Sequence, residues 1–392
     1  MHCWYFSEQS YHPAWDKVPG NPKIVPPATY IDPPTAHRLL QEYLRECQLA
    51  DELGMDIMVN EHHGTYTCMS VSCMVTLGAL AAVTKRARLL ALGIPIVNRM
   101  DPYRIAEEIA YVDNLSGGRL EVGLIKGTPF EMYMSNQNPA SSAARYWEVW
   151  DLVTAALKHQ DGPFSWESEN FNYRYVNVIP RCYQQPHPPM WLTTASTRTA
   201  AEAARRDCVL AITALARIAR ESFPLYRAEY QKLYNRRAPL SRFAYLSNIA
   251  IAKDERTARE RALKLLHFAE TSARLEERYI NPPGALMNAD NVRFLRAKAT
   301  TNHAERTRPD GTPMSNPPTP EDQAANGILF WGTPDQVYEQ LRAFYGSVGG
   351  FGNLIVQMGG TASHDELCDQ IQLFSTEVMP RLQKLTARQE AA

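Results

Sequence analysis

Gly54-Met55-Asp56-Ile57-Met58-Val59-Asn60-Glu61-His62-His63 is a short apolar run that ends in a carboxylate and two adjacent imidazoles. Such a run is typical of a buried strand. In parallel α/β proteins, ligand sites are built where strands end and in the loops that follow them. Glu61, His62 and His63 are therefore candidate site residues. The alternative is that they cap the strand and hydrogen bond to loop backbone.

The segments on both sides of this run alternate between strand and helix patterns. Strands are expected at 3–6, 55–60, 88–94, 119–124, 190–193, 208–213, 245–251 and 353–358. Helices are expected at 35–53, 72–84, 101–115, 142–159, 197–206, 217–235, 254–275, 334–347 and 365–380. Repeated βα units form parallel sheets. Eight strands predict an α/β fold of the (β/α)8 TIM-barrel class, as a single domain over residues 1–392.

Three insertions interrupt this rhythm. A Pro-rich loop spans 7–34, and alternating aromatic residues near 163–178 predict a β-hairpin. Residues 279–326 are rich in proline and follow an expected strand. A segment of this kind inside a compact fold is usually functional or disordered. Because it emerges on the expected site face, we interpret it as a mobile lid, with a disordered loop as the alternative.

Composition excludes several classes of protein. The 41 Lys and Arg residues nearly balance the 42 Asp and Glu residues, so no basic field points to nucleic acid or anionic lipid. A small molecule is the expected partner. The seven scattered cysteines contain no CxxC pair, which indicates a reducing compartment. No basic leader or membrane-length apolar run is visible, so the cytoplasm is the expected location. We also expect no metal site.

Nucleotide fingerprints are absent, but a phosphate site is possible. The chain has no GxGxxG after its first strand, no GxxxxGK[ST] loop and no HExxH. Thr194, Ala195, Ser196 and Thr197 instead open a helix directly after a strand, where free N–H groups and hydroxyls can receive an anion. The alternative is an ordinary N-cap.

Further candidate ligand-binding residues lie near other strand ends. They are Lys126, the adjacent Gly127, Arg145 and Asn98. Lys126 and Arg145 would converge with the hydroxyl cluster on one phosphate. The alternative is that each is an ordinary solvated charge. Gly127 would let backbone approach the ligand closely. Asn98 would hydrogen bond a ring edge, with a plain turn role as the alternative.

Several separated motifs in this order resemble the bacterial luciferase-like, flavin-dependent monooxygenases. They are Asp51-Glu52-Leu53-Gly54-Met55-Asp56 leading to Glu61-His62-His63, Pro102 to Glu108 running to Asp113 to Leu120, Gln185-Pro186-His187-Pro188-Pro189, Gly332-Thr333-Pro334, and Gln372 to Leu382. The resemblance covers nearly the whole chain. One difference is Ile125-Lys126-Gly127, where luciferases have Cys-Arg-Gly, and this argues against light emission.

The resemblance implies a TIM barrel that binds reduced FMN. In the family, O₂ and FMNH₂ give a flavin C4a-hydroperoxide that oxidises an organic substrate by Baeyer–Villiger insertion, hydroxylation or aldehyde oxidation. His62 matches the family's active-site histidine, with Glu61 orienting it and His63 supporting the pocket. Thr194, Ser196, Thr197 and Arg145 match positions around the flavin phosphate. Because no nicotinamide fingerprint is present, a separate NAD(P)H-flavin reductase is the expected partner.

Two other functions remain open: an F420-dependent oxidoreductase, and a non-catalytic flavin-binding subunit. Helix 72–84 is apolar nearly all round, although an outer barrel helix should have one polar side. Its second face is expected to pair with a second copy, giving a homodimer. Cover by the N-terminal loop is the alternative.

Overall fold

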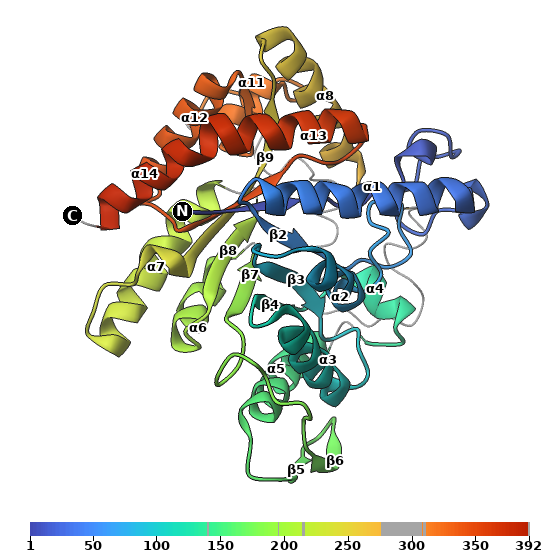
Figure 1. The fold of residues 1–392 in the computed structure, drawn as a ribbon, viewed down its shortest axis with the longest axis vertical. Coiled ribbons are helices and arrows are strands. Elements are labelled where there is room, and N and C mark those ends of the chain that lie inside the picture. Colours follow the sequence, from blue (N-terminus) through green and yellow to red (C-terminus); the bar gives the residue numbers. More distant parts are fainter. Residues whose placement is uncertain (139–140, 195, 214–215, 276–307, 309–310, 391–392) are drawn as a thin grey trace.

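The computed structural model is a closed parallel barrel surrounded by helices (Figure 1). It describes residues 1–138, 141–194, 196–213, 216–275, 308 and 311–390. The sheet order β10-β9-β11-β1-β2-β3-β4-β7-β8 is closed by pairing of β8 with β9. The predicted (β/α)8 barrel is confirmed.

The expected strands are present within two residues of their predicted bounds. The strands are β1 (His2–Phe6), β2 (Asp56–Val59), β3 (Leu89–Pro95), β4 (Leu120–Ile125), β5 (Phe164–Glu167), β6 (Asn172–Val176), β7 (Met190–Thr194), β8 (Val209–Thr213), β9 (Phe243–Ile251), β10 (Leu329–Gly332) and β11 (Asn353–Gln357). The strand β10 was not predicted. It pairs only with the second half of β9, from Asn248 to Ile251, beyond the point where β8 ends.

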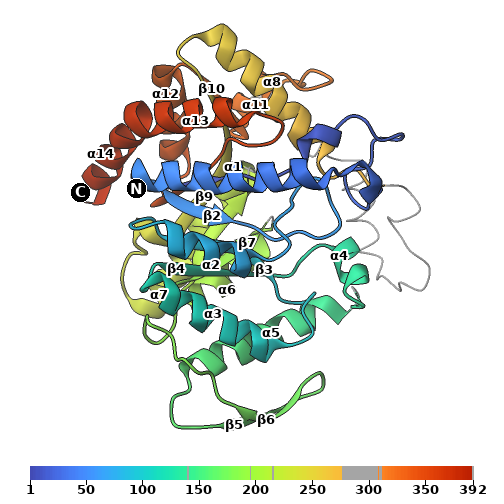
Figure 2. The same ribbon diagram turned by 45° about the vertical axis from the view of Figure 1, so that its right-hand side comes forward.

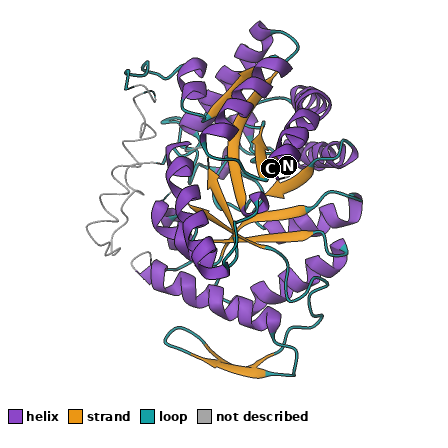
Figure 3. Cartoon of the chain, turned by 90° about the vertical axis from the view of Figure 1, so that its left-hand side faces the viewer, coloured by secondary structure: helices purple, strands orange, loops and turns teal. Residues whose placement is uncertain are grey.

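Helices enclose the barrel on its outside (Figure 3). They are α1 (Pro33–Glu52), α2 (Cys73–Val83), α3 (Pro102–Ser116), α4 (Pro129–Met134), α5 (Ser142–Lys158), α6 (Ala200–Arg205), α7 (Ala216–Tyr234), α8 (Glu255–Thr271), α11 (Pro320–Ala325), α12 (Pro334–Ser347), α13 (His364–Leu373) and α14 (Met379–Glu390). Short 3-10 turns occur at His12–Ala14, Ala28–Tyr30, Thr197–Thr199 and Leu240–Arg242.

The last helix runs further than the predicted end at residue 380. A π-helical segment, Phe374–Val378, joins α13 to α14, and the chain stays helical to Glu390. Pro380 lies two residues after this segment, with Met379 between them. A proline lacks an N–H and crowds the preceding turn, and a wider π turn before it relieves that conflict. The helix therefore continues past Pro380, where the sequence analysis had placed its end.

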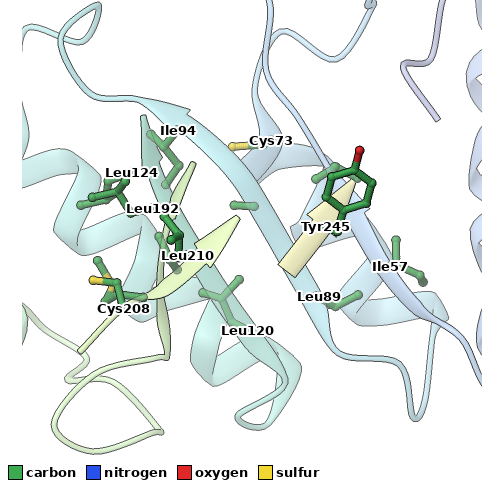
Figure 4. Packing of buried hydrophobic residues seen from close by; sticks show 14 of the residues in the cluster. Ile57, Cys73, Leu89, Ile94, Leu120, Leu124, Leu192, Cys208, Leu210 and Tyr245 are labelled. Carbon is green, nitrogen blue, oxygen red and sulfur yellow. The ribbon is translucent and has the colours of Figure 1, made fainter. Parts of the chain in front are cut away.

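Two apolar layers build the core. The barrel interior contains Trp4, Phe6, Met58, Leu90, Leu92, Trp191, Val209, Ala211, Ala244, Leu246 and Ile355. The second layer lies between strands and helices, and Figure 4 shows Ile57, Leu89, Leu120, Leu192 and Leu210 within it. Because side chains alternate along a strand, one set of residues fills the barrel and the other holds the helices.

Polar residues close the N-terminal end of the barrel. The guanidinium of Arg88 forms an ion pair with Glu121, and the indole of Trp191 donates a hydrogen bond to the same carboxylate at 2.6 Å. Arg88 also lies 3.5 Å from Asp56. With this end filled by packed, paired groups, the C-terminal end is the face on which a ligand site is expected.

The predicted insertions are found in part. The hairpin β5–β6 lies at the edge of the molecule beyond α3 and α5 (Figure 2), and the Tyr173 hydroxyl donates to Asp101 at 2.8 Å. The N-terminal loop is ordered, because Trp15 stacks on Phe268 with ring centroids 4.7 Å apart. Most of the predicted lid 279–326 lies outside the described residues. Its last part contains α11, so this part is not structureless.

Candidate functional site at the C-terminal ends of the strands

His62 lies in the loop after β2 and is held by a carboxylate from another loop. Its Nδ1 atom is 2.9 Å from Oε1 of Glu131, which also accepts the backbone N–H of His63 at 3.1 Å. The side chain of His62 is 28% exposed and that of Glu131 only 1%. A buried carboxylate therefore fixes the orientation of a partly accessible imidazole, an arrangement suited to proton transfer.

The carboxylate that contacts His62 is Glu131, whereas the sequence analysis assigned the orienting role to Glu61. Glu131 is the third residue of α4, and its Oε2 accepts the N–H of Thr128 at 3.1 Å and the Thr128 hydroxyl at 2.6 Å. Burial opposes its ionisation, but the hydrogen bond and charge of His62 together with the bonds from Thr128 hold the pKa of Glu131 below its ordinary value. The pattern Thr128-Pro129-Phe130-Glu131 is a capping box that could have indicated α4.

Glu61 instead joins a buried ion-pair network. Its carboxylate lies 3.3 Å from Nε2 of His63 and 2.8 Å from the guanidinium of Arg99, and accepts the N–H of Cys73 at 3.0 Å. Arg99 continues the network to Glu108 at 2.8 Å. Burial raises the pKa of Glu61, but His63, Arg99 and Cys73 outweigh it and the net shift is downward.

Asn98 and Gly127 meet at the ends of neighbouring strands. Asn98 follows β3 and is 6% exposed, yet neither Oδ1 nor Nδ2 has a hydrogen-bond partner among the described residues. Gly127 follows β4 with a φ of +84°, and a Cβ there would lie 2.8 Å from the Asn98 Oδ1. An unpaired buried carboxamide is costly unless a ligand completes its hydrogen bonds. Gly127 keeps the space beside it open.

An open hollow brings several predicted residues together. It has a volume of about 430 Å³, and its lining includes Glu61, His63, Asn98 and Arg99. The exposed side chains of Val71 and Met100 border it. The hollow thus takes its lining from the loops after β2 and β3 and the start of α3, with Ser135 from the segment after β4. Arg99, which lines the hollow, and Glu131, which contacts His62, were missed by the sequence analysis.

The predicted phosphate cluster is only partly assembled. The Thr194 hydroxyl accepts the N–H of Ser196 at 2.9 Å, and the Ser196 hydroxyl accepts the N–H of Arg198 at 3.3 Å. These are the contacts of an ordinary cap, and Thr197 begins the 3-10 turn that follows. Ala195 lies outside the described residues. The phosphate site remains a prediction.

The two predicted cations do not contact this cluster among the described residues. Lys126 is exposed. The guanidinium of Arg145 lies 4.6 Å from the ring centre of Phe171, beside the hairpin, and its buried Nε has no partner within the described parts of the chain. Burial lowers the pKa of Arg145. Arg145 therefore has one N–H donor without a partner, and it lies beside the hairpin and not beside the hydroxyl cluster.

The chemistry of these residues fits a flavin. The unpaired carboxamide of Asn98 offers the N–H donors of Nδ2 and the acceptor Oδ1, and the pyrimidine edge of a flavin has both acceptors and a donor for them. Residues 28–350 match the model of the luciferase-like monooxygenases. The chain belongs to the luciferase-like monooxygenase family.

The chain is also similar to curated proteins. The chain is 32% identical over 194 residues to an uncharacterised protein, y4wF, of Sinorhizobium fredii, covering 49% of this chain and 56% of that one. It is 27% identical over 188 residues to the oxygenase component of flavin-dependent trigonelline monooxygenase of Acinetobacter baylyi, covering 47% and 51%. These two alignments span about half the length of each relative.

Solved structures share the fold. Monooxygenase RslO1 of Streptomyces bottropensis superposes with a TM-score of 0.71 at 23% identity, covering 97% of this chain and 100% of that one. The oxygenating constituent of 3,6-diketocamphane monooxygenase of Pseudomonas putida, in complex with FMN, gives 0.68 at 17% identity, covering 88% and 94%. An F420-dependent secondary alcohol dehydrogenase gives 0.64 at 13% identity, covering 97% and 98%.

Three general properties complete the description. None of the described helices combines the length and apolar character that a membrane span requires. All seven cysteines lie in described segments and are free thiols. The described residues contain no cluster of three or more potential metal ligands.

Proposed function

We propose that this protein is the oxygenase component of a two-component monooxygenase that uses FMNH₂ and O₂ to oxidise a small organic molecule. The observation that carries the proposal is the placement of His62, Asn98 and Gly127 after three consecutive barrel strands, with His62 held by Glu131 and the unpaired Asn98 beside Gly127. Reduced FMN, when bound, supplies the electrons that activate O₂. The reaction class, whether Baeyer–Villiger insertion, hydroxylation or aldehyde oxidation, stays open.

The residues of the chain would divide the work. Asn98 would hydrogen bond the flavin ring edge, and the backbone at Gly127 would let the ring approach. Thr194, Ser196, Thr197 and Arg145 would hold the phosphate. His62, oriented by Glu131, would hold or pass a proton beside the reacting atoms. Glu61 and His63 would keep the surrounding loops in place.

A stopped-flow experiment tests the function without knowledge of the substrate. The anaerobic protein with FMNH₂ is mixed with oxygenated buffer, and absorbance is followed. We expect a long-lived absorbance phase, shifted to shorter wavelength than oxidised flavin, before the spectrum of oxidised flavin appears. The reason is that an oxygenase must keep water away from the flavin while it carries activated oxygen. Oxidation at the rate of free FMNH₂ would contradict the proposal.

The second candidate is an F420-dependent hydride transfer. The likeness of the barrel to an F420-dependent dehydrogenase favours keeping it as an alternative. Equilibrium binding separates the two, since retention of FMN and not F420 supports the oxygenase.

A separate NAD(P)H-flavin reductase would supply FMNH₂, as the term oxygenase component implies for the Acinetobacter relative. The free cysteines are consistent with a cytoplasmic location, which stays part of the proposal.

We also propose that two copies pair through α2 and α3. Val75 is 73% exposed, and Val71, Val83, Tyr111 and Leu115 are exposed on the same two neighbouring helices and the loop before them. Exposed apolar patches of this kind mark interaction sites.

Light scattering tests the dimer. We expect a mass of twice the 44.3 kDa chain for the unmodified protein, and a mass near that of one chain for Val75→Glu, because a buried unpaired charge opposes association. The matched control is Leu225→Glu on α7, a residue that is 49% exposed, which should remain dimeric. A monomeric unmodified protein would refute the pairing.

A further inference from the structure

A carboxylate that the proposed mechanism does not use lies at the C-terminal mouth of the barrel. Glu8 comes two residues after β1, whose Trp4 and Phe6 point into the barrel interior. The β1–β2 register pairs Trp4 with Asp56 and Phe6 with Met58, so Glu8 lies opposite Asn60. The alternation of side chains places Glu8 and Asn60 on the inner side of the barrel, above Phe6 and Met58.

The side chain of Glu8 is held in place from one side only. Its Oε2 accepts a hydrogen bond from Nδ2 of Asn60 at 2.5 Å, and Asn60 is itself oriented by the thiol of Cys68, 3.4 Å from its Oδ1. The second oxygen of Glu8, Oε1, has no protein partner among the described residues. The side chain is half-buried, so this oxygen remains accessible.

Glu8 differs from Glu61, Glu121 and Glu131 in forming no ion pair within the described residues, although the charge of His62 acts on it from a distance. Glu61 has Arg99, Glu121 has Arg88, and Glu131 has His62. No lysine or arginine in the described segments forms an ion pair with Glu8. Burial raises the pKa of Glu8, and the charge of His62 and the bond from Asn60 oppose this shift. Carboxylates that are partly removed from water are usually paired with a positive charge.

We propose that Glu8 is a specificity-determining residue that binds a cationic nitrogen of the substrate. The inference rests on the proposed function, since it places the substrate at the mouth beside His62. The free Oε1 accepts an N–H bond or faces a quaternary nitrogen, while the rest of the molecule lies over the apolar side chains of Phe6 and Leu246, which close the barrel beneath the mouth. The substrate class is therefore an amphipathic organic cation, in which an apolar body carries one positively charged nitrogen.

Calorimetric titration of the full chain with two probes of matched size tests this assignment. Benzylammonium carries the charge and benzyl alcohol does not. With FMN present, we expect benzylammonium to bind about tenfold more tightly, and Glu8→Gln to bring the two affinities within about twofold, because glutamine keeps the Asn60 bond but not the charge. The control Glu377→Gln removes the same charge at an exposed position on the outer helix and should keep the preference.

The outcomes separate this inference from the proposed function. Equal affinities in the unmodified protein, no binding of either probe, or a preference that survives Glu8→Gln would overturn the assignment, and the first two do not require the variant to fold. FMN binding and the stopped-flow phase are measured independently. A normal oxygenase phase without a charge preference refutes only the role of Glu8. A Glu8-dependent preference in a protein that binds no flavin supports the cation site and refutes the oxygenase.

Discussion

The His62→Ala variant is expected to lose the long-lived absorbance phase after FMNH₂ meets O₂. Positioned acid–base groups contribute about 10² to 10⁴ in rate, so we expect decay to oxidised flavin to become about 10²-fold faster. The affinity for FMN should change little, because the histidine holds a proton and the proposed flavin contacts come from other loops. Stopped-flow absorbance and a fluorescence titration with FMN measure the two quantities.

Glu131→Gln separates orientation from charge at the same site. Glutamine can keep the capping-box bonds to Thr128, but it cannot neutralise a protonated imidazole as the buried carboxylate does. We expect a smaller loss of lifetime than for His62→Ala, and a pH profile of decay displaced toward lower pH. An unchanged profile would show that Glu131 only caps α4. Unchanged decay in His62→Ala would remove His62 from the reaction.

The Glu61→Ala variant is expected to be the least stable of the substitutions considered. It leaves Arg99 without its buried partner and the N–H of Cys73 without an acceptor. Breaking a buried ion pair costs about 3–5 kcal/mol, and we expect about 3 kcal/mol because Arg99 keeps Glu108. Urea denaturation measures the free energy of unfolding. The matched control Glu108→Ala, which removes the more exposed partner of the same arginine, should cost about 1 kcal/mol or less.

The same pair predicts a dependence on pH. Burial opposes ionisation of Glu61, but His63 and Arg99 lower its pKa in the folded protein. A lowered folded pKa gives stability that is present above the ordinary glutamate pKa of about 4.3 and is lost as the pH falls toward the folded value. We expect Glu61→Gln to lack this part of the acid destabilisation. If the free energy of unfolding fell equally with decreasing pH in the unmodified protein and in Glu61→Gln, the assignment would be contradicted.

Local patterns predicted the barrel well. Eight apolar runs, each followed by a helix pattern, located the barrel strands within two residues, because burial on both faces leaves a continuous apolar signature. The strand β10 has only four residues, and it pairs with the second half of β9, beyond the residues of β9 that pair with β8. The short helix α4 was missed although its capping box is visible in the sequence. The end of α14 was misplaced at Pro380.

The residue types by themselves indicated where polar side chains follow the strands. The run ending in Glu61, His62 and His63, and the positions of Asn98 and Gly127, followed from strand patterns alone, because the ends of parallel strands share one edge. Only the tertiary structure decided which groups pair. Glu131 reaches His62 from 69 positions away and Arg99 reaches Glu61 from 38 positions away. Such pairing depends on the closure of the barrel and on burial, and neither leaves a trace in local sequence.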